Sequence, residues 1–169
     1  IYDIREENAR RFSDTVNKIY PHIKTIIAND INTAVRNSDI IDCVTLASEP
    51  FIKGKYLKKG TLVMNMEDYE VDNECVKRAD KVVVDYWENV KHRMISTVAL
   101  MWKDKLFKDS DLHAELGEIL AGTKSPREND DEIIYFNAVG AGIMDIAVTA
   151  RCYKNAVKKG KGIRLPFWE

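Results

Sequence analysis

The chain has 169 residues, of which 45% are hydrophobic and 31% charged, and its formal net charge is −1. This length and composition fit one globular domain with a hydrophobic core and exclude a fibrous or disordered chain. The near-zero charge gives no reason to expect a nucleic acid or a membrane as partner, and no apolar run reaches the roughly 20 residues that cross a bilayer. The three cysteines form no CxxC pair, so we expect free thiols in the cytoplasm.

The first predicted elements alternate between strand and helix. Residues 1–4 form a short strand, and apolar residues at helical spacing predict a helix over residues 9–19, which Pro21 closes. Residues 23–29 are the next strand, and Asp30 is placed to cap the helix that follows.

The middle of the chain continues this alternation. Residues 40–47 are a near-continuous apolar run, which predicts a strand buried on both faces of a parallel sheet. Further strands are expected over residues 61–66 and 81–87, with a short helix over residues 71–80. Apolar residues then predict one long amphipathic helix over residues 90–101.

The last third holds a helix over residues 112–120, a polar loop, a strand over residues 133–140 and a helix over residues 141–158. The whole order predicts an α/β fold, a Rossmann-like parallel sheet with helices on both faces. We expect residues 1–138 to form this domain and residues 139–169 to form a separate C-terminal helix and tail.

Two strand ends carry residues that suit a nucleotide. Asp3 stands where a dinucleotide-binding fold ends its second strand with a carboxylate that binds ribose hydroxyls and disfavours a 2′-phosphate. A turn or helix-capping aspartate explains the same residue, and Arg5 could pair with a phosphate. Residues 45–48 (TLAS) end a predicted central strand with small and hydroxyl side chains that a ligand could approach, although a plain loop junction has the same composition.

Further polar residues follow the later strands. Asn65, Glu67 and Asp68 come after an apolar strand, where a carboxylate could move protons in chemistry on an amine; a solvated loop is the alternative. Asn137 ends the last strand and could face a ligand, in a segment that lacks the GxGxxG spacing. The acids and histidine of residues 109–115 fit neither a calcium loop nor HExxH, so we expect no metal.

The order of these segments resembles the ornithine cyclodeaminase/mu-crystallin family over nearly the whole chain. The resemblance is carried by "AVRNSDIIDCVTLASEPFI", "GTLVMNMEDYE", "RADKVVVD" and the run from "HAELGEILAG" to "KKGKG". Its most specific piece is the spacing ELGEIL.G….R….E…F…G…D.A.A..Y..A…G.G. The "MNMEDY" segment is more similar to the branch with diaminopropionate-pathway dehydrogenases than to the "NAVGAD" of true ornithine cyclodeaminases.

This resemblance implies an NAD(P)-dependent enzyme that acts on amino acids or their imines, with a Rossmann domain and a dimerisation domain built from both chain ends. It implies NAD as the cofactor, with NADP left open, a homodimer, and Asp68 as the proton-transfer residue. The cofactor-binding residues that it implies are Asp3, Ile4, Arg5, Thr45, Leu46, Ala47, Thr61, Leu62, Val63, Met64 and Asn137.

In the family, a first strand, a glycine-rich turn and a substrate domain precede the position of residue 1. We therefore expect a fragment whose parent transfers a hydride at an amino-acid α-carbon, as in ornithine cyclodeamination, and which is a poor enzyme alone. Imine reduction, diamino-acid dehydrogenation and small-ligand binding without catalysis stay open.

Overall fold

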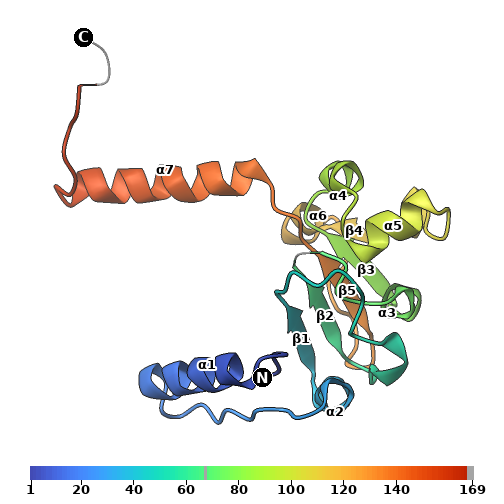
Figure 1. Cartoon of the computed structure of the whole chain (residues 1–169). Coiled ribbons are helices and arrows are strands. Elements are labelled where there is room, and N and C mark those ends of the chain that lie inside the picture. Colours follow the sequence, from blue (N-terminus) through green and yellow to red (C-terminus); the bar gives the residue numbers. More distant parts are fainter. Residues whose placement is uncertain (67, 167–169) are drawn as a thin grey trace. The chain divides into compact units, whose positions relative to one another are not determined.

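The computed structural model describes residues 1–66 and 68–166. The chain divides into two compact units, Ile1–Val139 and a second that begins at Gly140. The helices are α1 (Glu6–Ile19), α2 (Ile31–Asn37), α3 (Asn73–Lys77), α4 (Trp87–Arg93), α5 (Thr97–Lys103), α6 (Leu116–Leu120) and α7 (Gly142–Lys158), with short 3-10 turns at Gly54–Tyr56 and Asp109–Asp111 (Figure 1). The strands are β1 (Ile40–Cys43), β2 (Leu62–Asn65), β3 (Lys81–Val84), β4 (Ala114–Glu115) and β5 (Ile134–Asn137).

The strands form one parallel sheet in the order β1-β2-β5-β3-β4. Cys43, Asn65, Asn137 and Val84 are aligned across the four longer strands. Because each of them ends its strand, the carboxyl ends of these strands lie level at one edge of the sheet. The predicted parallel, Rossmann-like α/β fold is therefore confirmed.

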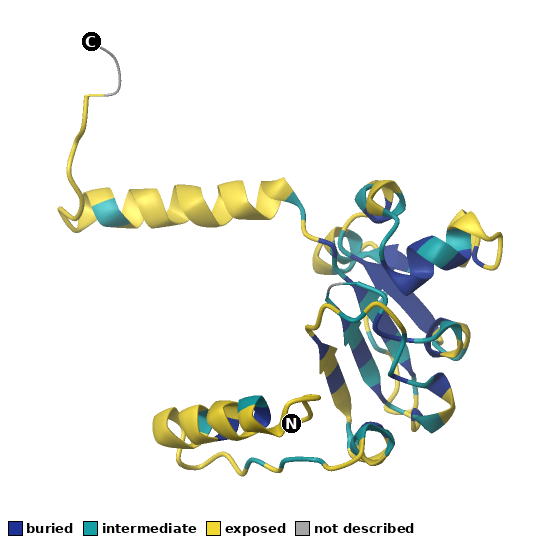
Figure 2. Ribbon diagram, viewed as in Figure 1, coloured by how far each residue is buried: buried dark blue, intermediate teal, exposed yellow. Residues whose placement is uncertain are grey.

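The core lies between one face of the sheet and the helices α3, α4 and α5 (Figure 1). Strand side chains alternate between faces, and the register places Ile41, Val63, Tyr135 and Val82 together on the covered face. Figure 2 shows buried residues concentrated where the sheet meets these helices. The other face of β2 and β5 is only half-buried.

The prediction that residues 40–47 form a strand buried on both faces is wrong. The strand β1 ends at Cys43 and alternates, with Ile40 62% exposed and Ile41 8% exposed. The reason is its position: β1 is at an edge of the described sheet, and only one of its faces contacts the core.

The single long helix predicted over residues 90–101 is also wrong. The chain forms α4 and α5, separated by Met94 in the left-handed conformation (φ 55°). This turn folds α5 back, so that the rings of Trp87 and Trp102 meet edge to face at 6.4 Å. Two neighbouring elements are shorter than predicted. The strand expected over residues 81–87 ends at Val84, and the helix expected over residues 112–120 begins only at Leu116, after β4.

The N-terminal segment contains the predicted helix α1, but neither flanking segment belongs to the five-stranded sheet. Instead, the amino group of Ile1 donates to the carbonyl of Ile26 at 2.8 Å, and the amide of Ala28 donates to the carbonyl of Ile1 at 2.8 Å. These two hydrogen bonds have the pattern of two extended segments that run parallel. The predicted cap of α2 is confirmed, because the Asp30 carboxylate accepts from the Thr33 amide at 2.8 Å.

The second unit contains α7, none of whose residues is buried within this chain. None of the described helices has the length and apolar composition that crossing a bilayer requires.

Candidate functional site

Two buried asparagines mark the carboxyl edge of the sheet. Asn65 and Asn137 end the neighbouring strands β2 and β5, are paired in register and have no exposed surface. Each lies two residues after a core residue, Val63 or Tyr135, so strand alternation turns both amides toward the covered face. Parallel α/β sheets bind ligands at this edge.

Asn65 uses its whole side chain in hydrogen bonds. Its Nδ2 donates to Glu70 Oε2 at 2.8 Å and to the carbonyl of Asp68 at 3.1 Å, and its Oδ1 accepts from the Tyr135 hydroxyl at 2.8 Å. Its main-chain carbonyl accepts from Asn137 Nδ2 at 2.7 Å. Asn65 therefore joins two strands to the loop that carries Asp68.

Glu70 is a buried acid that the sequence did not single out. Its side chain has no exposed surface, and its Oε1 accepts from both the amide and the hydroxyl of Thr45, the latter at 2.8 Å. With the bond from Asn65, three donors surround this carboxylate, which offsets the loss of hydration. Asn65, Glu70 and Tyr135, with Thr45 and Asn137, are called the edge network below.

Asp68, the predicted proton-transfer residue, lies in the loop after β2 and is partly exposed. Asn65 holds its main chain, which brings Asp68 next to the edge network. Glu67, which the sequence placed beside it, lies outside the described residues.

The Oδ1 atom of Asn137 is buried and has no hydrogen-bond partner among the described residues. A buried acceptor without a donor costs about 1–3 kcal/mol. A ligand with an N–H or O–H group at this edge would remove that cost.

The segment after β1 reaches the same edge. Thr45 is bound to Glu70, Leu46 is 88% exposed and Ala47 is partly exposed. Both hydrogen-bond donors of Thr45, its amide and its hydroxyl, point at Glu70. Thr45 can therefore contact a ligand through its surface but donates no hydrogen bond to it.

The structure does not bring the other predicted cofactor residues to the edge network. Thr61 precedes β2 and is bound to the carbonyl of Ser38 at 3.4 Å, Leu62 starts the strand, and Val63 is fully buried in the core. Only Met64, next to Asn65, lies close to the carboxyl edge.

Asp3, Ile4 and Arg5 lie at the start of α1. The Asp3 carboxylate accepts from the Arg5 amide at 2.7 Å, Arg5 is the N-cap residue of α1, and Ile4 is 89% exposed. This is the local turn that the sequence offered as an alternative for Asp3, and its role at a ribose stays a prediction.

The acids and histidine of residues 109–115 have structural partners. Asp109 accepts from the Trp87 indole at 2.9 Å, Glu115 accepts from the Trp87 amide at 2.9 Å, and His113 Nε2 is 2.8 Å from the Ser125 carbonyl. In the described part of the chain, no group of three or more His, Cys, Asp or Glu side chains is arranged to hold a metal.

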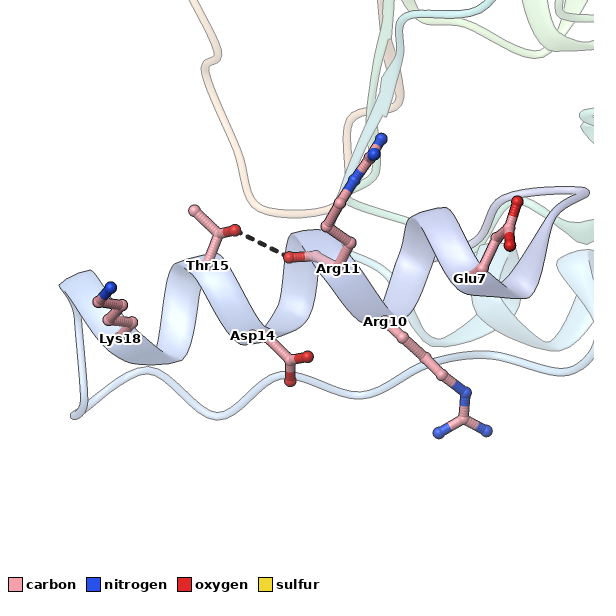
Figure 3. A pocket seen from close by; sticks show the side chains of 6 residues that line it. All are labelled: Glu7, Arg10, Arg11, Asp14, Thr15 and Lys18. Carbon is pink, nitrogen blue, oxygen red and sulfur yellow. Dashed lines mark hydrogen bonds between the residues drawn. The ribbon is translucent and has the colours of Figure 1, made fainter.

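A shallow hollow along α1 is lined by Glu7, Arg10, Arg11, Asp14, Thr15 and Lys18 (Figure 3). All six come from one helix, and Figure 3 shows Arg10 and Arg11 pointing to opposite sides of it. Such side chains do not converge on a ligand.

Burial keeps two ionisable groups near the edge network neutral, Cys43 and Tyr135. Burial, with Glu70 nearby, raises the pKa of the Cys43 thiol to about 12. Burial likewise raises the pKa of Tyr135 well above its ordinary value, so its hydroxyl remains a donor to Asn65. Neither group is a nucleophile near neutral pH.

The profile of the ornithine cyclodeaminase/mu-crystallin family matches residues 1–160. The chain belongs to this family.

Two relatives illustrate the range of activities within it. The chain is 33% identical over 168 residues to N-((2S)-2-amino-2-carboxyethyl)-L-glutamate dehydrogenase of Staphylococcus aureus, covering 99% of this chain and 50% of the relative. It is 33% identical over 172 residues to a Delta(1)-pyrroline-2-carboxylate reductase of Bacillus cereus, covering 99% and 52%. The chain thus spans about half the length of the curated relatives it matches.

Two solved structures share the fold. One is the Thermococcus litoralis Delta(1)-pyrroline-2-carboxylate reductase in complex with NADH and L-proline, with a TM-score of 0.90 and 32% identity over 97% of this chain and 51% of that one. The other is an archaeal alanine dehydrogenase dimer with bound NAD, with a TM-score of 0.89 and 30% identity over 99% and 52%.

Proposed function

We propose that this chain is the nucleotide-binding part of an NAD(H)-dependent oxidoreductase that interconverts an amino acid and its imine. The observation that carries this proposal is the edge network, which gathers buried polar groups and the Asp68 loop at the ligand-binding edge of a parallel sheet. The reductase and the dehydrogenase that are similar in structure were solved with NADH and NAD, which supports the choice of cofactor.

The described residues fit a nicotinamide at this edge. The unpartnered Oδ1 of Asn137 is an acceptor, and a carboxamide supplies the N–H donors that it lacks. We assign residues 45–47 and Met64 to the cofactor surface beside Asn137, and Asp3 to Arg5 to the adenosine end. When bound, the nicotinamide supplies the hydride transfer, while the protein supplies position and proton transfer.

Asp68 is the residue that we assign to proton transfer. It is partly exposed, so it can exchange a proton with a substrate amine or with an attacking water, and Asn65 fixes its main chain. Replacing it by Asn removes the proton acceptor and keeps the size of the side chain. We expect turnover to fall by about 10²–10⁴-fold with NADH affinity nearly unchanged.

Imine reduction is the direction that we favour, because a pyrroline-carboxylate reductase is among the similar proteins by sequence and by structure. Dehydrogenation of a diamino acid derivative is supported by the similar staphylococcal dehydrogenase. Ornithine cyclodeamination needs the same hydride step and is the second candidate. We also propose that the protein that contains this chain is a homodimer, because the similar archaeal alanine dehydrogenase is a dimer. We propose the cytoplasm as its location.

The test follows NADH absorbance with the natural protein that contains this chain, and with the 169-residue chain alone. The substrates are a cyclic imine carboxylate, pyruvate with ammonia, and L-ornithine, L-proline or L-alanine with NAD. We expect turnover of at least one substrate, and we expect Asp68→Asn to lower this turnover by about 10²–10⁴-fold. NADH binding without turnover of any substrate would instead indicate a ligand-binding protein.

A further inference from the structure

We propose that Glu70 is a positioning residue for this reaction, because its buried carboxylate fixes the Asp68 loop through Asn65 and the cofactor-side segment through Thr45. This inference rests on the proposed function. Glu70 lies two residues after Asp68, and no described contact gives it a direct role in the chemistry.

The two carboxylate oxygens of Glu70 serve two different segments. Oε1 binds the amide and hydroxyl of Thr45, which follows β1, and Oε2 binds Nδ2 of Asn65, which ends β2. Glu70 thereby holds Thr45, which lies 25 positions earlier in the sequence, and Asn65 at one buried point. Since its own carbonyl accepts from the amides of Phe51 and Ile52, its main chain is fixed as well.

The orientation of the Asn65 amide follows from the chemistry of its neighbours. A carboxylate and a carbonyl only accept, so Nδ2 must face both Glu70 and Asp68, at 2.8 and 3.1 Å. Oδ1 then faces the Tyr135 hydroxyl, which must donate. Changing the acceptor at residue 70 therefore disturbs the donor that holds Asp68.

The substitution Glu70→Gln keeps the contact of residue 70 with Thr45 and disturbs its contact with Asn65. The new amide oxygen can still accept from Thr45, but the new NH₂ group faces the NH₂ group of Asn65, and two donors repel. If Asn65 turns its oxygen to the new amide, the Asp68 carbonyl loses its donor. We expect kcat to fall by about tenfold to a hundredfold, as for a misplacement of an ångström or less, with the KM for NADH little changed.

A second substitution distinguishes positioning from stability. In the double variant Asn65→Asp with Glu70→Gln, the glutamine amide donates to the new carboxylate and Tyr135 donates to its other oxygen, so the buried pair is complementary again. The carbonyl of Asp68 still has no donor. We expect the unfolding midpoint to recover toward that of the wild type, while kcat stays low.

The experiment measures kcat, the KM for NADH and the urea unfolding midpoint for the wild type, Glu70→Gln, Asn65→Asp and the double variant. Glu74→Gln is the matched control, because it removes the same charge from a position at the start of α3 that is not buried, and we expect it to leave kcat unchanged. An unaltered kcat in folded Glu70→Gln, or a double variant that regains kcat together with its midpoint, would overturn the proposal.

Amide hydrogen exchange keeps this test separate from the proposed function. If the wild type turns over no substrate, the proposed function fails, but the amide exchange of residues 68–70 still reports how Glu70 holds the loop. We expect faster exchange there in Glu70→Gln than in Glu74→Gln. Equal exchange in these two variants would remove Glu70 as the residue that holds the loop.

Discussion

The hydroxyl of Tyr135 offers a direct measure of how much the edge network stabilises the fold. Tyr135 has no exposed surface, and its hydroxyl donates to Asn65 Oδ1 at 2.8 Å. Tyr135→Phe keeps the ring in the core, so no large cavity forms. It leaves Asn65 Oδ1 as a buried acceptor without a donor.

The expected loss is about 1–3 kcal/mol of unfolding free energy, the cost of one unsatisfied buried acceptor. For a chain of this size, each kcal/mol lowers the melting temperature by about 2–4 °C, so the expected decrease is about 2–12 °C. The loss applies at neutral pH, since burial raises the pKa of Tyr135 and keeps the hydroxyl protonated.

Urea unfolding followed by circular dichroism gives the free energy, and thermal melting gives the temperature. Tyr20→Phe is the control, because Tyr20 is 50% exposed, and surface changes of this kind usually stay within about 0.5 kcal/mol. A Tyr135→Phe variant as stable as this control would refute the buried hydrogen bond to Asn65.

Further predictions concern the rest of the fold. Gly54→Ala should cost about 1–3 kcal/mol, because its Cβ would lie 2.4 Å from the main chain of α3, whereas Gly117→Ala, with nothing within 4 Å, should be neutral or stabilising in urea unfolding. Lys81 binds two glutamates whose pKa values are lowered. The stability that these two ion pairs contribute is present above the ordinary glutamate pKa and is lost in acid. Lys81→Met should therefore lower the urea unfolding midpoint at neutral pH and much less in acid. Alkylation should reach Cys152 in the native chain and Cys43 only in urea; equal rates would contradict the burial of Cys43. Its pKa, raised to about 12, also predicts stability that falls as pH rises above the ordinary thiol pKa.

The sequence was sufficient to predict the parallel α/β fold and the strands β2, β3 and β5, while the carboxyl edge as the ligand site stays a prediction. Apolar runs that end in polar residues identified β2 and β5, and a parallel sheet necessarily aligns the residues that follow them. This is why Asn137 and the Asp68 loop were found together.

What the sequence could not predict depends on contacts between distant residues. Glu70 reads as one more acid of a polar loop, and only the three donors from Thr45 and Asn65 explain its burial. The break at Met94 has no glycine to signal its positive φ. The exposure of Ile40 follows from the place of β1 at the edge of the described sheet, which a hydrophobic run alone does not reveal.

The most direct test of the account is amide hydrogen exchange with and without NADH on the natural protein that contains this chain. We expect protection in residues 44–48, 64–66, 68–70 and 136–139 at the carboxyl edge, and none in residues 54–61, which precede β2. Protection confined to residues 54–61, or no protection at saturating NADH, would contradict a nucleotide site built on the edge network.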